Sequence, residues 1–250
     1  MATSPGRASD VDELLFVDTV ELRWFARGRI APEVVSWFTE GGRSGVLEER
    51  RDSYRIDGRS DIGVKRRFRE TLELKIRLSI GEHLMVDSHL AGALEVWRKW
   101  SPADRLVTSG EDERWFDVHK TVTKRRFTAD GHEIVLAAGE RAFAGTGCDV
   151  EIAAVSVEGV EAWTLAFAAF GQGHDRTRAI IAAWKALTAE SRHPERFEAS
   201  LSRSAGYPEW LTQVIPTARV VGKRELAFPR TIPPCNVEVR PPSRSSPAWS

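Results

Sequence analysis

The strongest constraint in this sequence is a pair of alternating segments between residues 63 and 78. In residues 71–78, every second residue is apolar and the residues between them are polar or charged. The apolar members are Leu72, Leu74, Ile76 and Leu78. Successive side chains of a strand point to opposite faces, so this pattern predicts a β-strand with one apolar and one charged face. Residues 63–69 alternate in the same way, and a turn at Arg69-Glu70 would lay the two strands side by side.

Basic side chains occupy one face of both segments. They are Lys65, Arg67 and Arg69 in the first and Lys75 and Arg77 in the second. Five cations on two neighbouring strands repel one another unless anions or carboxylates lie among them. We expect Lys65, Arg67, Lys75 and Arg77 to share a polar interior. Leu74 and Ile76 should pack on the other side. An ordinary solvent-exposed strand also alternates polar and apolar residues, so that interpretation stays open.

The overall charge restricts the classes of partner. Lys plus Arg and Asp plus Glu both number 36, which gives a net charge near zero. Proteins that bind nucleic-acid backbones need an excess of positive charge, so general nucleic-acid binding is not expected. No apolar run is long enough to span a membrane, and the first residues lack an apolar signal core. We therefore expect a cytoplasmic protein without a membrane partner.

Common catalytic and metal-binding motifs are missing from the sequence. Cys148 and Cys235 are far apart and support neither a disulfide framework nor a zinc site. The six histidines lack the spacing of a metal-binding pair. The sequence contains no glycine-rich dinucleotide loop, no P-loop and no nucleophile elbow. Nucleotide binding by those routes and hydrolysis by a serine triad are therefore unsupported.

The remaining patterns predict mostly strands. Further strands are expected at residues 14–28, 49–56, 114–130, 132–144 and 149–157, and a turn at Glu158-Gly159 leads to one more. Helices are expected at 30–40, where Pro32 suits the first turn, and at 175–191. Residues 88–100 fit either a helix, which we favour, or interrupted pieces of strand.

We divide the chain into three parts. Residues 1–12 are small and polar and are predicted to be a disordered leader. Residues 13–221 form one α+β domain, which closes with short helices around Phe197 and Trp210. Residues 222–250 form a Pro-rich tail that is predicted to be extended or disordered.

Several charged motifs follow one another in a familiar order. They are Thr19-x-Glu21-x-Arg23, Arg51-Asp52-Ser53-Tyr54, Gly63 to Arg67, Leu72-Glu73-Leu74-Lys75 and Asp149-Val150-Glu151-Ile152. This order resembles the CYTH superfamily, the triphosphate tunnel metalloenzymes, over roughly residues 14–190. The resemblance implies a mostly antiparallel eight-stranded β barrel around a polar tunnel, with flanking helices. In that family Arg and Lys hold phosphates, and Glu residues hold a divalent metal.

The resemblance also implies site residues. The phosphate-binding set would be Arg23, Lys65, Arg67, Arg69, Lys75, Arg77, Lys124 and Arg126. Glu21 and Glu151 would hold Mg²⁺ or Mn²⁺, with Glu73 and Asp149 as further candidates. The motif has Thr19 where the family has a Glu, and the segment 163–168 lacks the family's Glu pair. Because Mg²⁺ relies on such carboxylates, the metal site is expected to be degenerate, and the remaining acids could instead neutralise neighbouring Arg and Lys.

Three functions remain open. The favoured one is a basic tunnel that binds a phosphorylated small molecule or a polyphosphate-like anion. The second is a divalent-metal-dependent triphosphate hydrolase, which the missing carboxylates disfavour. The third is a non-catalytic interaction protein with an internally salt-bridged barrel and a tail that contacts a partner. The excess of basic over acidic residues on the strands at 63–78 favours ligand binding over the third function.

Overall fold

The computed structural model of the protein describes residues 16–39, 46–67, 71–87, 90–101, 115–135, 145–171, 175–189 and 204–215. Several sequence expectations lie outside these residues. They are the leader 1–12, the tail 222–250, Arg69 with its turn, and the helix around Phe197.

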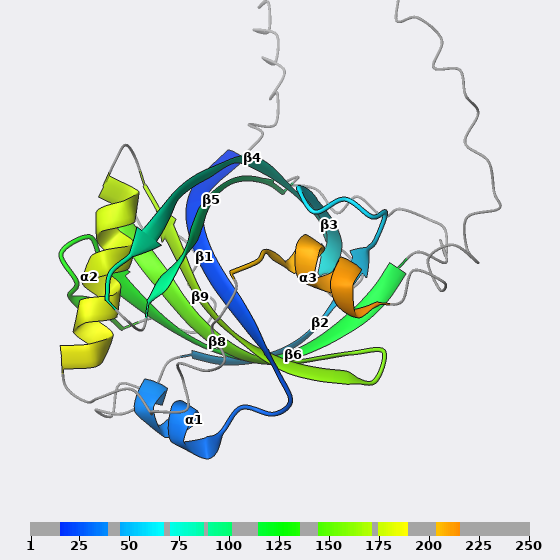
Figure 1. Ribbon diagram of the computed structural model, residues 1–250, viewed down its shortest axis with the longest axis horizontal. Helices are drawn as coiled ribbons and strands as arrows, with labels where there is room; N and C mark the ends of the chain where they lie inside the picture. Colours follow the sequence, from blue (N-terminus) through cyan, green and yellow to red (C-terminus); the bar gives the residue numbers. More distant parts are fainter. Residues whose placement is uncertain are drawn as a thin grey trace, which may run out of the picture.

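Antiparallel strands close into a barrel (Figure 1). Its eight strands are β1 (Phe16–Arg27), β2 (Val46–Arg55), β3 (Ile62–Arg67), β4 (Thr71–Met85), β5 (Ala91–Trp100), β6 (Trp115–Thr128), β8 (Gly147–Val157) and β9 (Val160–Phe170). Their order is β2-β3-β4-β5-β1-β9-β8-β6, and pairing of β6 with β2 closes the ring. A two-residue strand, β7 (Glu133–Ile134), adds to the end of β6. The expected eight-stranded antiparallel barrel is confirmed.

The β8–β9 hairpin shows how the local sequence sets the pairing. Glu158 and Gly159 form the connection, with φ angles of 49° and 78°. Two residues of positive φ make a tight turn whose twist matches that of the flanking strands. The register then runs from Val157 opposite Val160 to Gly147 opposite Phe170. The turn predicted at this dipeptide is therefore correct.

Two helices cover the outer wall of the barrel on one side (Figure 1). They are α1 (Pro32–Thr39) and α2 (Asp175–Ala189), close to the two helices predicted from sequence. Trp37 of α1 and Trp184 of α2 contact each other, with ring centroids 6.2 Å apart. Both pack against outward-facing strand residues such as Phe167. None of the helices in the described ranges is long and apolar enough to cross a membrane.

A third helix, α3 (Tyr207–Val214), lies across one end of the barrel (Figure 1). Trp210 stacks on Phe25 of β1, with ring centroids 4.5 Å apart. The two residues belong to a cluster with inward-facing side chains such as Phe116 and Val118 of β6. The barrel interior is therefore apolar at the α3 end.

Two expectations from the sequence are wrong. The segment for which we favoured a helix, 88–100, contains strand β5, because it pairs with β1 on one side and β4 on the other. The apolar row of β4 lies on the outer side, as expected, but it is not packed there, and Ile76 and Leu78 are 38% and 48% exposed. The charged row of β4 takes the interior, in line with the expectation, and Glu73 is buried there. Of the strand expected at 132–144, the described residues show only β7.

Candidate functional site

Charged side chains collect on the inner wall of the barrel. Every second residue of a strand points inward, and ion pairs across the barrel identify which ones. The inward cations among the described residues are Arg23, Arg50, Lys65, Arg67, Lys75, Arg77, Lys99, Lys120, Lys124 and Arg126. The inward carboxylates are Glu21, Glu48, Asp52, Glu73, Glu95, Asp149 and Glu151. Seven of the eight predicted phosphate-binding residues thus lie on this wall, and Arg69 is outside the described residues.

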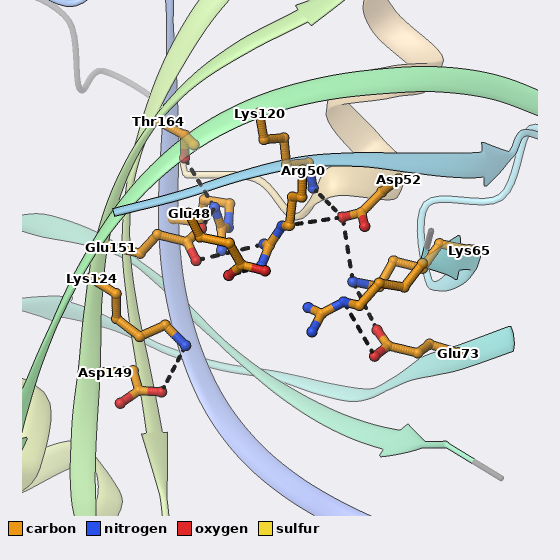
Figure 2. Close-up of polar contacts among 12 residues, drawn as sticks. Glu48, Arg50, Asp52, Lys65, Glu73, Lys120, Lys124, Asp149, Glu151 and Thr164 are labelled. Atoms are coloured by element: carbon orange, nitrogen blue, oxygen red, sulfur yellow. Dashed lines mark hydrogen bonds and ion pairs between the residues drawn. The ribbon is translucent and has the colours of Figure 1, made fainter. Parts of the chain in front are cut away.

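Asp52 is the first centre of a network of ion pairs (Figure 2). Its buried Oδ2 lies 3.1 Å from Lys120 Nζ, 3.5 Å from Arg50 Nε and 3.6 Å from Lys65 Nζ. Burial alone would raise the pKa of the Asp52 carboxyl. The charges of Lys65, Lys120 and Arg50 outweigh burial and hold that pKa below its ordinary value. Asp52 therefore stays ionised at neutral pH.

Glu73 is the second centre. Its carboxylate oxygens lie 2.8 Å from Lys65 Nζ, 3.1 Å from Lys99 Nζ and 3.8 Å from Arg67 Nε. Burial would raise the pKa of Glu73, but Lys65, Lys99 and Arg67 lower it by more. Because Lys65 contacts both Asp52 and Glu73, the two centres belong to one network.

Cations outnumber carboxylates in this network. Arg50 extends it to Glu48 at 3.1 Å and to Glu151 at 3.9 Å, and Glu151 pairs with Arg23 at 3.2 Å. The cations are Arg23, Arg50, Lys65, Arg67, Lys99 and Lys120, and the carboxylates are Glu48, Asp52, Glu73 and Glu151. With every group ionised, the network carries a formal charge of +2 among the described residues. Excess positive charge enclosed by a barrel wall attracts anions.

Lys120 is the most deeply buried cation of the network, with a side chain only 1% exposed. Its ammonium donates a hydrogen bond to the Tyr54 hydroxyl at 2.7 Å and lies 3.8 Å from the centroid of the Tyr207 ring. Burial lowers the pKa of Lys120 well below its ordinary value, and the nearby cations Lys65 and Arg50 add to this. A neutral Lys120 would leave the network with a formal charge of +1. The network ends here, where the aromatic residues of the α3 end begin.

Two further groups of ion pairs lie outside the network. Lys75 Nζ contacts both oxygens of Glu21, at 2.5 and 2.6 Å. Asp149 accepts a hydrogen bond from Arg126 Nε at 2.6 Å and one from Lys124 Nζ at 3.2 Å. The predicted cations of β4 and β6 are therefore each held by a nearby carboxylate.

Arg77 links the charged interior to helix α3. Its guanidinium pairs with Glu95 of β5 and lies 3.8 Å from Glu209 of α3. It also lies 5.6 Å from the centroid of the Trp97 ring. These contacts fix Arg77 more firmly than an exposed arginine, and they tie α3 to the barrel wall.

The inner face of β9 is built from small residues. Ala162, Thr164, Ala166 and Ala168 occupy its inward positions, where the family resemblance implied a Glu pair. Arg23 Nη1 donates a hydrogen bond to Thr164 Oγ1 at 3.3 Å. The inner face of β9, next to β1, therefore adds no charge to the interior.

The predicted metal ligands Glu21 and Glu151 are engaged by cations. Both oxygens of Glu21 contact Lys75, and those of Glu151 contact Arg23 and Arg50. The described part of the chain contains no cluster of three His, Cys, Asp or Glu residues arranged to hold a metal ion. The donor set does not fit Mg²⁺ or Mn²⁺ in this arrangement, because bound ammonium and guanidinium groups occupy the carboxylate oxygens.

Arg50, Lys99 and Lys120 belong to the network but were missed in the sequence. Lys99 was missed because its segment was expected to be helical. Arg50 alternates with Asp52 on β2, and Lys120 alternates with Lys124 on β6, so period-two alternation could have identified both. Their partners lie on other strands, and this proximity depends on closure of the barrel.

A groove of about 700 Å³ lies on the outside of the barrel. The segment Gly28–Ile30 and outward-facing residues such as Arg51, His119 and Ser156 contribute to its lining. None of the residues predicted from the sequence lines it, whereas Arg50 and Lys120 of the network contribute to its lining. Its exposed Arg29 pairs with exposed Glu161, and Arg51 pairs with Asp117. We therefore place the candidate site in the interior, where cations are in excess.

Comparisons with protein-family models, curated proteins and solved structures gave no match. The interpretation of the barrel interior therefore depends on the geometry and charge of its own residues.

Proposed function

We propose that the barrel interior binds a small phosphorylated or polyphosphate-like anion, as a divergent, CYTH-like tunnel with a degenerate metal site. The observation that carries this proposal is the interior network, in which six cations face four carboxylates. Uncompensated positive charge in a partly dehydrated space is costly, and an anionic ligand would offset that cost.

Three partly exposed lysines of the inner wall would give the ligand a route of access. The side chains of Lys75, Lys99 and Lys124 are about one-third exposed, at 33%, 37% and 33%. Each pairs with a carboxylate, and its side chain is partly open to solvent. A lysine can share its three donors between a carboxylate and a phosphate oxygen. These residues would make the first contacts with an entering anion.

Arg67 would bind the ligand further inside. Its Nε is buried and makes no hydrogen bond to any described residue, although Glu73 lies 3.8 Å away. A buried donor without an acceptor is costly, and a phosphate oxygen would supply the missing acceptor. The planar guanidinium can bind phosphate through two parallel hydrogen bonds.

The alternative functions have less support. Metal-dependent triphosphate hydrolysis would require Glu21 and Glu151 to exchange their cation partners for a metal ion. A purely structural, internally salt-bridged barrel would require the charges to balance, whereas the network has two more cations than carboxylates. Ligand binding in the cytoplasm, without catalysis, is therefore the function that we propose.

Variants of the inner wall test this proposal, with tripolyphosphate as the probe in a chelator-containing buffer. Arg67→Ala and Lys75→Ala should each lower affinity by about 1.5–3 kcal/mol in isothermal titration calorimetry, the usual scale for a charge-assisted hydrogen bond. Arg59→Ala is the matched control, because Arg59 is 56% exposed and pairs only locally with Asp61. Equal affinities in all three variants would reject the interior as the binding site.

A further inference from the structure

Exposed apolar residues are concentrated on two strands of the barrel, β1 and β4. Among the described residues, eight large hydrophobic side chains are exposed, and six of them belong to β1 and β4. They are Phe16, Val17, Ile76, Leu78, Ile80 and Met85; Phe16 and Ile76 point outward by register, whereas Val17 and Ile80 lie opposite the inward-facing Lys99 and Glu95. Scattered single hydrophobic residues are normal on a protein surface, so Phe16 and Ile76 indicate an interaction surface only where apolar neighbours on adjacent strands join them into one continuous face.

The strand register makes this surface continuous. On the outer wall, Ile62 of β3 lies opposite Ile76 of β4, and Leu74 of β4 lies between Val64 of β3 and Trp100 of β5. Trp100 in turn lies opposite Phe16 of β1. We name these six residues the outer apolar face: Phe16, Ile62, Val64, Leu74, Ile76 and Trp100. The face runs across four neighbouring strands, on the wall that α1 and α2 leave uncovered (Figure 1).

The face contains one pair of opposite charges. Asp18 and Arg98 are register partners on β1 and β5, and their side chains form two hydrogen bonds of 2.7 and 2.8 Å. Arg98 is also the partner of Ile76, and its guanidinium lies 6.0 Å from the centroid of the Phe16 ring. The ion pair is therefore surrounded by the apolar residues and cancels its own charge within the face.

We propose that the outer apolar face binds a second copy of this chain, as a two-fold symmetric dimer. A patch with one acid beside one base is complementary to itself, because a two-fold rotation brings Asp18 of one copy toward Arg98 of the other. The chain has no net charge, so two copies do not repel each other overall. The strands of the closed barrel pair on both sides, which leaves a face rather than a free strand edge for association.

The test is the oligomeric state of the full chain, measured by sedimentation velocity over a range of concentrations. We expect a dimer, and Ile76→Glu should weaken it about thirtyfold or more, since it places a carboxylate in the centre of the apolar contact. Leu47→Glu is the matched control, because Leu47 is 65% exposed on β2, away from the face. It should leave the dimer unchanged. A wild-type monomer, or a dimer insensitive to Ile76→Glu, would overturn the proposal.

Amide hydrogen exchange provides a second measurement that needs no variant. Protection of peptides covering 71–78 should increase with protein concentration in step with dimer formation. Protection that does not depend on concentration would mean that no second copy covers the face, which also overturns the proposal. This test does not depend on tripolyphosphate binding, so it can fail while the proposed function stands.

Discussion

Lys65 and Glu73 face each other directly across the β3–β4 ladder, and the Lys65 ammonium lies 2.8 Å from the Glu73 carboxylate. The same carboxylate also pairs with Arg67 and Lys99. One acid thus compensates three cations. Glu73 therefore controls how much positive charge this side of the interior offers to a ligand.

Replacing Glu73 should lower the stability of the protein and raise its affinity for the ligand. Glu73→Gln removes the partner of three buried or partly buried cations, and we expect the free energy of unfolding to fall by about 3–5 kcal/mol. Tripolyphosphate affinity should rise, because the ligand no longer competes with the carboxylate. Urea unfolding and calorimetry measure the two quantities. The control is Glu161→Gln, an exposed partner of Arg29, which should change stability by less than about 1 kcal/mol.

Glu21→Gln distinguishes a binding protein from a metalloenzyme. Glu21 pairs with Lys75 in the structure, so its neutralisation should leave tripolyphosphate affinity unchanged or increase it. A metal ligand would behave in the opposite way, since its loss would abolish turnover. Phosphate release with Mg²⁺ or Mn²⁺ should remain at background in both proteins. If the wild-type protein cleaves tripolyphosphate in a metal-dependent reaction and Glu21→Gln abolishes that reaction, the protein is a hydrolase and the binding proposal is wrong.

Stability should decrease at acid pH. Burial raises the pKa values of Glu73 and Glu151, but neighbouring cations, led by Lys65 and Arg23 respectively, lower them by more. A carboxyl with a lowered folded-state pKa contributes stability that is fully present above its unfolded pKa of about 4.3 and is lost as pH falls toward the folded value. The free energy of unfolding should therefore fall between about pH 5 and 3. A flat profile there would contradict the buried ion pairs.

The contribution of helix α3 to stability can be tested through one aromatic contact. Trp210 is 7% exposed and stacks on Phe25, so Trp210→Ala leaves a cavity at the apolar end of the barrel. We expect a loss of about 3–5 kcal/mol in the free energy of unfolding. Thr212→Ala, at an exposed position on the same helix, should cost far less. Equal losses would mean that α3 contributes through its helical backbone rather than through this contact.

Local patterns predicted much of the barrel. Alternation identified β3 and β4, the Glu158-Gly159 dipeptide identified the last hairpin, and helical spacing identified α1 and α2. These signals depend on a few adjacent residues, so one sequence is enough to find them. The segment that forms β5 lacked such a signal, since Gly92 interrupts its pattern and pairing with two distant strands decides its structure.

The alternation of β4 alone does not give its orientation; the clustering of basic residues in the segment 63–78 is what predicted the charged face inside. A period of two defines two faces without saying which one is inside. The charged face turns inward because acids on other strands neutralise it, as Glu21 does for Lys75 from 54 residues away. Arg23 and Glu151 are 128 residues apart. Such partners become neighbours only when the barrel closes.

The most direct test of the central claim is the affinity of the wild-type protein for tripolyphosphate in excess chelator, measured by calorimetry at low and at high salt. We expect binding without any divalent metal, and a marked loss of affinity at high salt because mobile ions screen the inner-wall cations. Absence of binding in chelator, with recovery on addition of Mg²⁺ or Mn²⁺, would contradict this claim.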